Sequence, residues 1–562
     1  MKYRFRYSLK EMTVRLFALA KPIRFYLVIS TLASIFGNLA HMGLMGFGVL
    51  WILSAAGKVN ASPSVYIVMT VISAILIPVC RYLEGVFSHI GAYGILAKMR
   101  VHLFEILERV SPAYLIDNQK GDILNIAVSD IETLEFFFAH TIGPMFTVII
   151  LPLTTLLIAA HYNPLFAWIL LPVYIMISVV IPLGGLKLGR SIGMRYRRSL
   201  GTLKSLVLES VYGIRDIQIF GHGNRRAQQI RRQNDEVSKA AHGMTIHREV
   251  LNALPNFFVY LARIFIIAIA AKLAAEGKGD PAGTVVISFV AAASFSSTFS
   301  LTFVVSHLLE AYAAAERFFI IEDTVPAVRE NENPAEMDHI DEIRFNNVSF
   351  RYPSSENNVL DHTSFTVHKG EKIGIYGESG IGKSTIMRLL LRFYDPASGS
   401  VMINRKNLKD YSFAGLHSHI ALMEQETSLF DATIAENIAF GKPAASKEEI
   451  ITAAKRAGIA DFIETLPEGY ETQMGQMAAR LSGGERQRIG IARVLLSDPD
   501  VILMDEPSSS LDVFHEKELL QTIHNEYQDK TVIIISHRMS TLGGCEKIFR
   551  LINGRMYEEI HY

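Results

Sequence analysis

Long apolar stretches recur through the first 320 residues of this 562-residue chain. We place six of them, roughly at 23–55, 63–108, 122–160, 164–210, 225–275 and 282–320. A helix of about 20 apolar residues crosses a bilayer, so each stretch is long enough to span one. Several are longer, and these helices are expected to project beyond the bilayer as stalks. Half of all residues are hydrophobic and the mean hydropathy is +0.25, which favours a multi-pass membrane protein.

Charge and cysteine content exclude several other classes. The formal net charge is +0, which argues against a general nucleic-acid binder. Cys80 and Cys545 are the only cysteines and lie far apart, so a disulfide framework and a zinc site are both excluded. The basic start, MKYRFRYSLK, is followed by no small-residue cleavage site, so a cleavable signal peptide is not predicted.

The chain changes character across Ile321–His339, an acidic, proline-containing stretch that is typical of a linker. After it, β-rich runs such as KIGIYG, DVILMDE and TVIIISH alternate with helical patterns. That alternation predicts an α/β domain with a largely parallel sheet. The predicted organisation is therefore a six-helix membrane domain at 1–320, a linker at 321–339 and an α/β domain at 340–562.

Basic residues are distributed unequally between the two sets of loops. The connections KVNASPS, HYNP and GKGDPAG carry few of them, whereas AKMRVHLFEILER, KLGRSIGMRYRRS and GNRRAQQIRRQ carry many. By the positive-inside rule, the N-terminus and the basic stalks face the cytoplasm. An even number of spans returns the chain there, so the α/β domain is expected on the cytoplasmic side of the cytoplasmic (inner) membrane.

A phosphate-binding loop is predicted at GESGIGKST, which follows the strand KIGIY and opens the helical run TIMRLLLRF. Its glycines allow backbone N–H groups to turn toward phosphate oxygens, and the helix N-terminus adds partial positive charge. The alternative is a glycine-rich turn without a ligand. The predicted ATP-binding residues are Gly377, Glu378, Ser379, Gly380, Ile381, Gly382, Lys383, Ser384 and Thr385.

Two carboxylates end the apolar strand DVILMDEP. Asp505 is placed to hold Mg²⁺ and Glu506 to act as general base on the attacking water. Lys383 is expected to reach the β- and γ-phosphates and the Ser384 hydroxyl to bind Mg²⁺. A buried strand with an acidic cap is the alternative interpretation.

LSGGERQR, at Leu481–Arg488, resembles the signature of the ATP-binding cassette (ABC) superfamily, and the resemblance extends over about 340–562. It implies an adenine-stacking role for Tyr352, and it implies that Gln425 senses Mg²⁺ at the membrane-facing loop. It also implies that His537 contacts the γ-phosphate and that Ser509–Asp512 crosses a dimer interface. Exporters often have Gly-Glu-x-Gly ahead of the signature, where this chain has Gly475-Gln476-Met477-Ala478.

Six spans followed by one cassette resemble an exporter-type (type IV) half-transporter. The resemblance implies that two cassettes close head to tail around ATP, so Ser482, Gly483 and Gly484 serve the partner's nucleotide. It also implies catalytic roles for Glu506 and His537. The runs Ser111–Lys120 and Tyr212–Gly221 are candidate coupling helices, and the partner is a second half-transporter.

Ionisable residues inside membrane spans are costly and often functional, so they indicate where a small-molecule substrate could bind. Arg81 and Glu84 lie about one helical turn apart in the second span, with His89 further along. These three are the candidate substrate residues; the alternative is an internal Arg81–Glu84 pair on one helix face. Helix capping or packing is the simpler interpretation of His41, His140 and Arg263.

The run Arg81-Tyr82-Leu83-Glu84, followed by Ser88-His89, resembles the R-Y-x-E-x-x-x-S-H pattern of CydC-type subunits. That resemblance implies a heterodimer with a CydD-like chain rather than a homodimer. It implies thiol cargo such as cysteine or glutathione, and haem as ligand or cargo with His89 on the iron. The family commonly has Arg after the Glu, and Gly85 here lacks that cation for a haem propionate.

Four other functions fit parts of the sequence. They are an importer of haem or iron chelates on the same fold, a multidrug, lipid or peptide exporter, a soluble ABC ATPase, and a sensor whose ATP turnover reports ligand occupancy.

Overall fold

A computed structural model describes residues 6–118, 120–276, 280–353, 355–425, 427–475, 481–507, 516, 521–522 and 524–559, without the side chains of 186, 190, 274, 296–306 and 309. The chain forms two compact units. The helical unit is Met1–Leu107 with Lys120–Thr324, and the α/β unit is Glu108–Gln119 with Val325–Tyr562. The boundaries of the linker at 321–339 stay a prediction.

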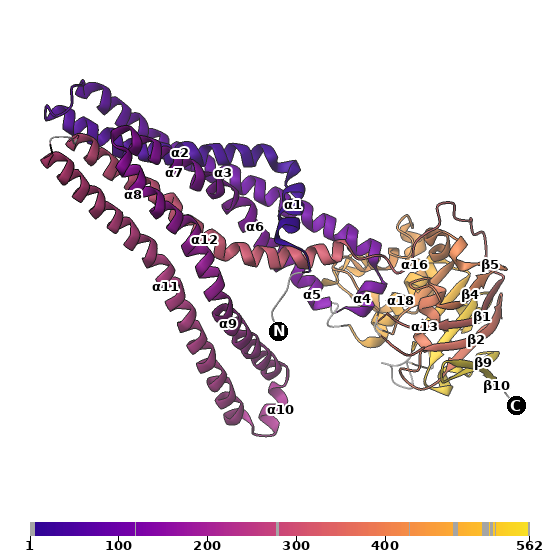
Figure 1. Ribbon diagram of the computed structural model, residues 1–562. Coiled ribbons are helices and arrows are strands. Elements are labelled where there is room, and N and C mark those ends of the chain that lie inside the picture. Colours follow the sequence, from indigo (N-terminus) through magenta and orange to yellow (C-terminus); the bar gives the residue numbers. More distant parts are fainter. Residues whose placement is uncertain are drawn as a thin grey trace. The chain divides into compact units, whose positions relative to one another are not determined.

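The helical unit contains the predicted apolar spans as long helices (Figure 1). Proline at the first helical position and an Asx cap account for two of its helix starts. Asn163 accepts from Leu165 N before Pro164, and Asp280 accepts from Ala282 N before Pro281. Its elements are α1 (Leu9–Leu19), η1 (Lys21–Ile23), α2 (Arg24–Ala55), α3 (Pro63–Val110), α5 (Lys120–Asn125), η2 (Ile126–Asp130), α6 (Ile131–His140), α7 (Ile142–Tyr162), α8 (Pro164–Ile175), η3 (Met176–Val180), α9 (Ile181–Tyr212), α10 (Ile214–Ile219), α11 (Gly223–Ala275) and α12 (Pro281–Glu322).

Five stretches of the described residues are long and apolar enough to cross a bilayer, and one shorter apolar helix follows them. The long apolar helices expected from the sequence are therefore present. The five stretches are Lys21–Ala55, Pro63–Val110, Lys120–Tyr162, Pro164–Gly189 and Gly223–Leu273, and the shorter helix is Pro281–Phe295.

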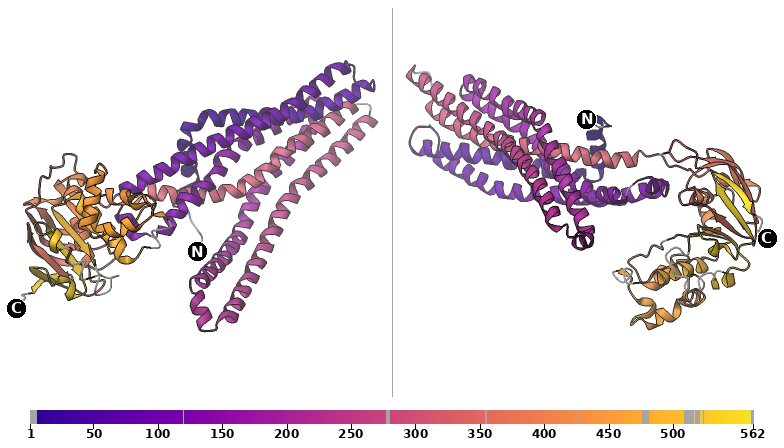
Figure 2. Two further views of the ribbon diagram at one scale, coloured as in Figure 1. Left: turned by 180° about the vertical axis from the view of Figure 1, so that it is seen from behind. Right: turned by 90° about the horizontal axis from the view of Figure 1, so that it is seen from below.

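Helix packing in this unit depends on both large and small side chains. Met42 of α2, Leu151 of α7 and Val290 of α12 are buried in one apolar cluster. α9 and α11 run side by side and are joined at one end by α10 (Figures 1 and 2). At Gly185 a Cβ atom would lie 2.6 Å from Leu251 Cδ2, so glycine permits this close approach.

The α/β unit has two sheets. An antiparallel sheet has the order β2-β1-β4-β5, and a six-stranded sheet has the order β10-β9-β3-β8-β7-β6. In the second sheet β6, β7, β8, β3 and β9 are mutually parallel, as expected, and β10 is antiparallel. The strands are β1 (Glu342–Phe350), β2 (Leu360–His368), β3 (Lys372–Tyr376), β4 (Ser398–Ile403), β5 (Lys406–Asn407), β6 (Ile420–Met423), β7 (Val501–Asp505), β8 (Thr531–Ser536), β9 (Lys547–Ile552) and β10 (Arg555–Glu559).

Most helices of this unit are short, and several of them pack on the parallel sheet. Its buried strands are almost entirely apolar, as strands covered on both faces must be. The helices are α4 (Ala113–Asp117), α13 (Lys383–Leu390), η4 (Leu408–Asp410), α14 (Phe413–His419), α15 (Ile434–Ala439), α16 (Lys447–Arg456), α17 (Ala460–Thr465), η5 (Gly469–Glu471), α18 (Gly483–Ser497) and η7 (Met539–Leu542).

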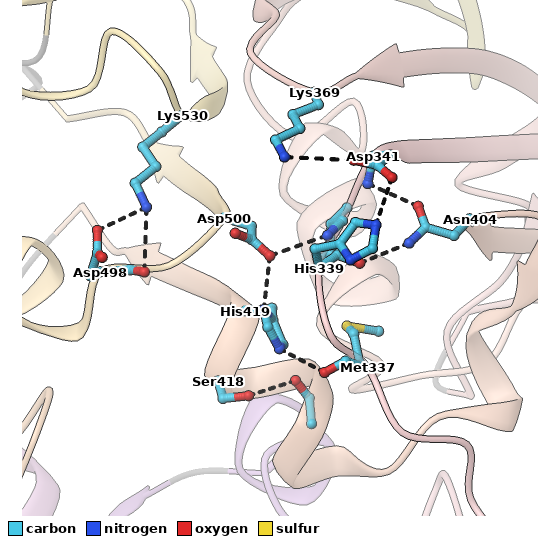
Figure 3. A network of polar contacts seen from close by, with 12 residues as sticks. Met337, His339, Asp341, Lys369, Asn404, Ser418, His419, Asp498, Asp500 and Lys530 are labelled. Atoms are coloured by element: carbon cyan, nitrogen blue, oxygen red, sulfur yellow. Dashed lines mark hydrogen bonds and ion pairs between the residues drawn. The ribbon is translucent and has the colours of Figure 1, made fainter.

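A polar network attaches the segment that precedes β1 to this unit (Figure 3). His419 Nδ1 donates to Asp500 Oδ2 at 2.8 Å, and His419 Nε2 lies 2.9 Å from Met337 O. Asp500 also accepts from Ile340 N at 3.1 Å. These hydrogen bonds therefore hold the segment from Met337 to Ile340 in place just before β1.

Candidate nucleotide site and membrane polar cluster

The parallel strands of the α/β unit bring the predicted nucleotide residues to one edge. Paired positions near the strand ends are Tyr376 with Ser536 and Met423 with Met504. Because parallel strands share one carboxyl edge, the segments that follow β3, β6, β7 and β8 emerge together. Those segments contain the phosphate-binding loop, Gln425, the Asp505–Glu506 pair and His537.

The predicted phosphate-binding loop joins β3 to α13, in the strand–loop–helix order that the motif requires. Gly380 and Gly382 have φ values of 80° and 110°, a region that favours glycine. Lys383 is 5% exposed, and its Nζ donates to Gly377 O and Glu378 O at 2.8 Å each. Burial lowers the pKa of Lys383. The charges of Glu506 and Asp505 also act on Lys383. A buried cation that is hydrogen-bonded to two backbone carbonyls is placed to exchange those bonds for phosphate oxygens.

Asp505 and Ser384 form an oxygen-rich pair beside the loop. The Ser384 hydroxyl hydrogen-bonds the Asp505 carboxylate, yet burial raises the pKa of Asp505 above its ordinary value. Hard oxygen ligands of this kind are those Mg²⁺ prefers, and a divalent cation would compensate the buried charge. The residues present therefore fit Mg²⁺.

Glu506 and His537 face each other across the ends of β7 and β8. His537 Nδ1 lies 3.2 Å from Glu506 Oε1. Glu506 has a φ of 49°, and its N–H donates to Ile535 O at 2.9 Å. A non-glycine residue in this conformation is uncommon and often functional. The pair therefore places a carboxylate and an imidazole side by side at the carboxyl ends of β7 and β8.

Tyr352 lies against the start of α13. Its hydroxyl is 2.9 Å from Thr385 Oγ1 and accepts from Arg388 Nη1 at 2.8 Å. Phe350 packs edge-on against the Tyr352 ring, with centroids 4.9 Å apart. The predicted adenine-stacking residue is thus anchored through its hydroxyl to the predicted phosphate-binding helix.

The signature segment begins α18 with a capping box. Ser482 Oγ accepts from Glu485 N at 3.2 Å, and Glu485 Oε2 accepts from Ser482 N at 2.7 Å. The S-x-x-E spacing in the sequence accounts for this start. Ser482 and Gly483 are exposed, and Gly484 is partly exposed. The N-terminus of a 15-residue helix is therefore open to another molecule.

The remaining predicted positions are Gln425 and two loop segments. Gln425 is exposed just after β6. Ser509–Asp512, the predicted interface loop, lies outside the described residues, as do Gln476–Ala478 of the segment before the signature.

The membrane candidates form two polar groups in the helical unit, one around Arg81 and one around His89. Arg81 Nη1 donates to Glu84 Oε2 at 2.8 Å, and Arg81 Nη2 donates to Asn38 Oδ1 at 3.1 Å. His89 Nδ1 donates to Glu135 Oε1 at 3.1 Å. Arg81 and Glu84 are therefore paired with each other, in line with the alternative interpretation of these two residues, and they also reach α2.

His89 has further neighbours that the sequence did not reveal. Its ring lies 5.2 Å from that of His140 and 5.7 Å from that of Tyr93. Asn38 and Glu135 also belong to this cluster although the motifs do not include them. An amide within the apolar α2 and a carboxylate next to the apolar run 136–138 are the sequence signals that could have identified them.

An apolar cavity of about 320 Å³ lies between α2, α7 and α12. Arg81, Glu84 and His89 are not among its lining residues. These are Leu39, Met42, Gly43, Gly46, Phe47, Leu50, Thr154, Ile158, Tyr162, Val286 and Val290.

Comparison with known families gives two matches. Residues 25–300 match the ABC transporter transmembrane region, and residues 360–509 match the ABC transporter domain. One relative is a protein of Haemophilus influenzae named Probable ABC transporter ATP-binding/permease protein. It is 34% identical over 94% of this chain and 97% of its own length.

Two further relatives have more specific names. An ATP-dependent lipid A-core flippase of Syntrophus aciditrophicus is 31% identical over 85% of this chain and 80% of its own length. The glutathione/L-cysteine transport system protein CydC of Haemophilus influenzae is 28% identical over 98% of this chain and 96% of its own. A bacterial Atm1-family ABC exporter structure with ATP bound shares the fold, with a TM-score of 0.79, 24% identity and 95% of each chain covered.

This chain belongs to the ABC transporter family. It is an exporter-type half-transporter in which a membrane domain and an ATP-binding domain are fused, and its activity is ATP hydrolysis coupled to transport.

Proposed function

We propose that this half-transporter moves a small substrate out of the cytoplasm, as a CydC-like subunit of a heterodimer that handles thiols or haem. The observation that carries the proposal is the polar cluster around Arg81 and His89 in otherwise apolar helices. The length-matched similarity to CydC supports it. The chain lies in the cytoplasmic membrane, with the N-terminus and the α/β unit in the cytoplasm.

In the nucleotide site, Tyr352 stacks on adenine and the 377–385 loop holds the phosphates of ATP. Lys383 contacts the β- and γ-phosphates. Ser384, Asp505 and Gln425 would hold Mg²⁺, which would supply positive charge to neutralise the phosphates. Glu506 polarises the attacking water, and His537 contacts the γ-phosphate while holding the Glu506 carboxylate.

Two chains are needed to complete each site. The open N-terminus of α18 presents Ser482, Gly483 and Gly484 to ATP bound by the partner chain. Exposed apolar residues around α10 support a second contact, because Tyr212 is 86% and Phe220 71% exposed. We assign α10 as a coupling helix that docks on a cassette.

The substrate proposal depends on the mixed charge of the cluster. Arg81 offers a cation to a carboxylate, and Glu84 and Glu135 offer anions to an amine, as an amino-acid thiol would require. For haem, the Glu135 contact at Nδ1 leaves His89 Nε2 as the iron-binding atom. Gly85, next to Glu84, supplies no cation for a propionate.

A second candidate function is export of an amphiphile such as a lipid. The apolar cavity between α2, α7 and α12 supports it, since hydrophobic ligands are held in cavities with few polar groups. A lipid substrate would use this cavity and leave the Arg81–His89 cluster as a structural feature.

We expect ATP hydrolysis by the purified heterodimer to rise when cysteine, glutathione or haem is added. The His89→Ala variant should need about tenfold more haem for half-maximal stimulation, because one ligand bond and its Glu135 contact are lost. The measurement is phosphate release against concentration of each compound.

His161→Ala is the matched control. His161 lies at the C-terminal end of α7, whereas His140, the neighbour of His89, precedes the start of α7. The His161 ring packs on Tyr162. The variant should respond like the unmodified protein. A flat response to all three compounds, with stimulation by lipid instead, would refute the thiol or haem proposal and favour the amphiphile.

A further inference from the structure

Glu516 is a buried carboxylate to which the proposed ATP chemistry gives no role. It is helical and 7% exposed. A buried carboxylate has to be hydrogen-bonded or paired with a cation, because taking its charge out of water is costly. The residues that contact Glu516 therefore indicate what its charge does.

Both carboxylate oxygens of Glu516 contact the segment that follows β8. Thr541 Oγ1 donates to Glu516 Oε1 at 2.8 Å, and Arg538 Nη1 donates to Glu516 Oε2 at 3.4 Å. Thr541 is 2% exposed and belongs to η7, whereas the Arg538 side chain is 40% exposed. Leu542, at the end of η7, is fully buried, so this end of the turn is fixed by the core. One carboxylate thus links the fixed end of the turn to Arg538 at its start.

His537 lies between this link and the end of β8. Ser536, the last residue of β8, is buried, and its Oγ accepts from Arg538 N at 3.0 Å. The backbone on either side of His537 is therefore held, by β8 before it and by Glu516 through Arg538 after it. The His537 side chain is exposed, with its Nδ1 3.2 Å from Glu506 Oε1. The place of this ring accordingly depends on contacts made by its neighbours in the chain.

We infer that Glu516 is a positioning residue for ATP hydrolysis, which holds His537 beside Glu506 through its contacts with Arg538 and Thr541. The inference rests on the proposed roles of His537 and Glu506. If Glu516 served only to stabilise the fold, its loss would act on turnover independently of His537.

A double-mutant cycle in the purified full-length transporter, with the partner's nucleotide site disabled, tests this. Glu516→Gln keeps the size of the side chain and removes the charge that pairs with Arg538. Its kcat for ATP hydrolysis should fall about tenfold while KM for ATP changes less than about twofold, because a shift of about 1 Å in a catalytic group can cost about 100-fold in rate. Since the loss is expected to act through His537, adding Glu516→Gln to His537→Ala should lower kcat no further.

Arg538→Gln removes the other half of the ion pair at a partly exposed position, so it tests the inference even if Glu516→Gln does not fold. It should show the same fall in kcat and the same lack of a further effect in His537→Ala. Glu526→Gln is the matched control, because Glu526 also pairs with an arginine, with 2.6 Å between its Oε2 and Arg456 Nε. The kcat of this control should equal that of the unmodified chain.

Each outcome has a distinct meaning. Losses that multiply in the double variant overturn the inference, because Glu516 would then act independently of His537. A normal kcat in both Glu516→Gln and Arg538→Gln overturns it too, as does an equal loss in Glu526→Gln, which would show a general effect of removing a carboxylate. A normal kcat in His537→Ala instead refutes the proposed role of His537, which is part of the proposed function, and removes the premise of the inference.

Discussion

The Glu506→Gln variant is expected to bind ATP normally and to hydrolyse it at least about 100-fold more slowly at this chain's own site. The amide has the shape of the carboxylate but cannot accept a proton, and a positioned general base contributes about 10²–10⁴-fold to rate. The backbone bond from Glu506 N to Ile535 O is unaffected, so the side chain keeps its position. Phosphate release and equilibrium ATP binding measure the two effects separately.

The partner's site must be disabled in the same experiment, since its turnover would mask the loss. Glu371→Gln is the matched control, because Glu371 pairs with Lys547 at 2.5 Å and lies just before β3, at the opposite end of the strands from the Glu506 carboxylate. Its turnover should stay near normal. If Glu506→Gln hydrolyses ATP as fast as the unmodified chain, the general-base assignment is wrong.

The Lys383→Ala variant is expected to be defective in ATP binding, the step before hydrolysis, with affinity for ATP lowered about 100-fold. Hydrogen bonds to charged groups contribute about 1.5–3 kcal/mol each, and Lys383 is the buried cation of the loop. Its two bonds to Gly377 O and Glu378 O also disappear, so the loop loses its internal support. Equilibrium binding of a fluorescent ATP analogue is the measurement.

Lys530→Ala is the control for this change. Lys530 pairs with Asp498 at 2.8 Å, at the start of β8 rather than at its carboxyl end. The affinity of the Lys530→Ala variant for ATP should equal that of the unmodified chain. Unchanged affinity in Lys383→Ala would show that GESGIGKST is a glycine-rich turn and not the phosphate-binding loop.

Much of the cassette could be predicted because its motifs are local. A strand, a glycine loop and a helix define the Lys383 environment within about a dozen residues. Capping of α18 by Ser482 and Glu485 follows from spacing alone. The convergence of Asp505 and His537 follows from parallel strands, which share one carboxyl edge. The roles of these residues stay predictions until the variants are measured.

Other features depend on contacts between residues far apart in the sequence. A hydrogen bond from the Tyr394 hydroxyl to Ala113 O joins positions separated by 281 residues. The grouping of 108–119 with the α/β unit also depends on such contacts. The sequence predicts a candidate coupling helix at Ser111–Lys120, but hydropathy by itself gives only the flanking helices. Such contacts are decided by packing of the whole core and leave no local pattern.

The membrane cluster shows the same limit at the proposed substrate site. Ionisable residues in apolar spans identified Arg81, Glu84 and His89, but not what each would contact. The structure pairs His89 with Glu135 of α6 and Arg81 with Asn38 of α2. Since these partners decide which charges face a substrate, substrate class depends on them more than on the motif.

ATP-dependent accumulation in membrane vesicles tests the central claim most directly. Vesicles would contain this chain with its candidate partner, and the probes would be radiolabelled cysteine and glutathione. We predict accumulation in inverted vesicles that requires ATP and is lost when Glu506→Gln is combined with an inactive partner site. Accumulation only in right-side-out vesicles would show an importer, and ATP hydrolysis without movement of either probe would contradict the proposed transport of thiols.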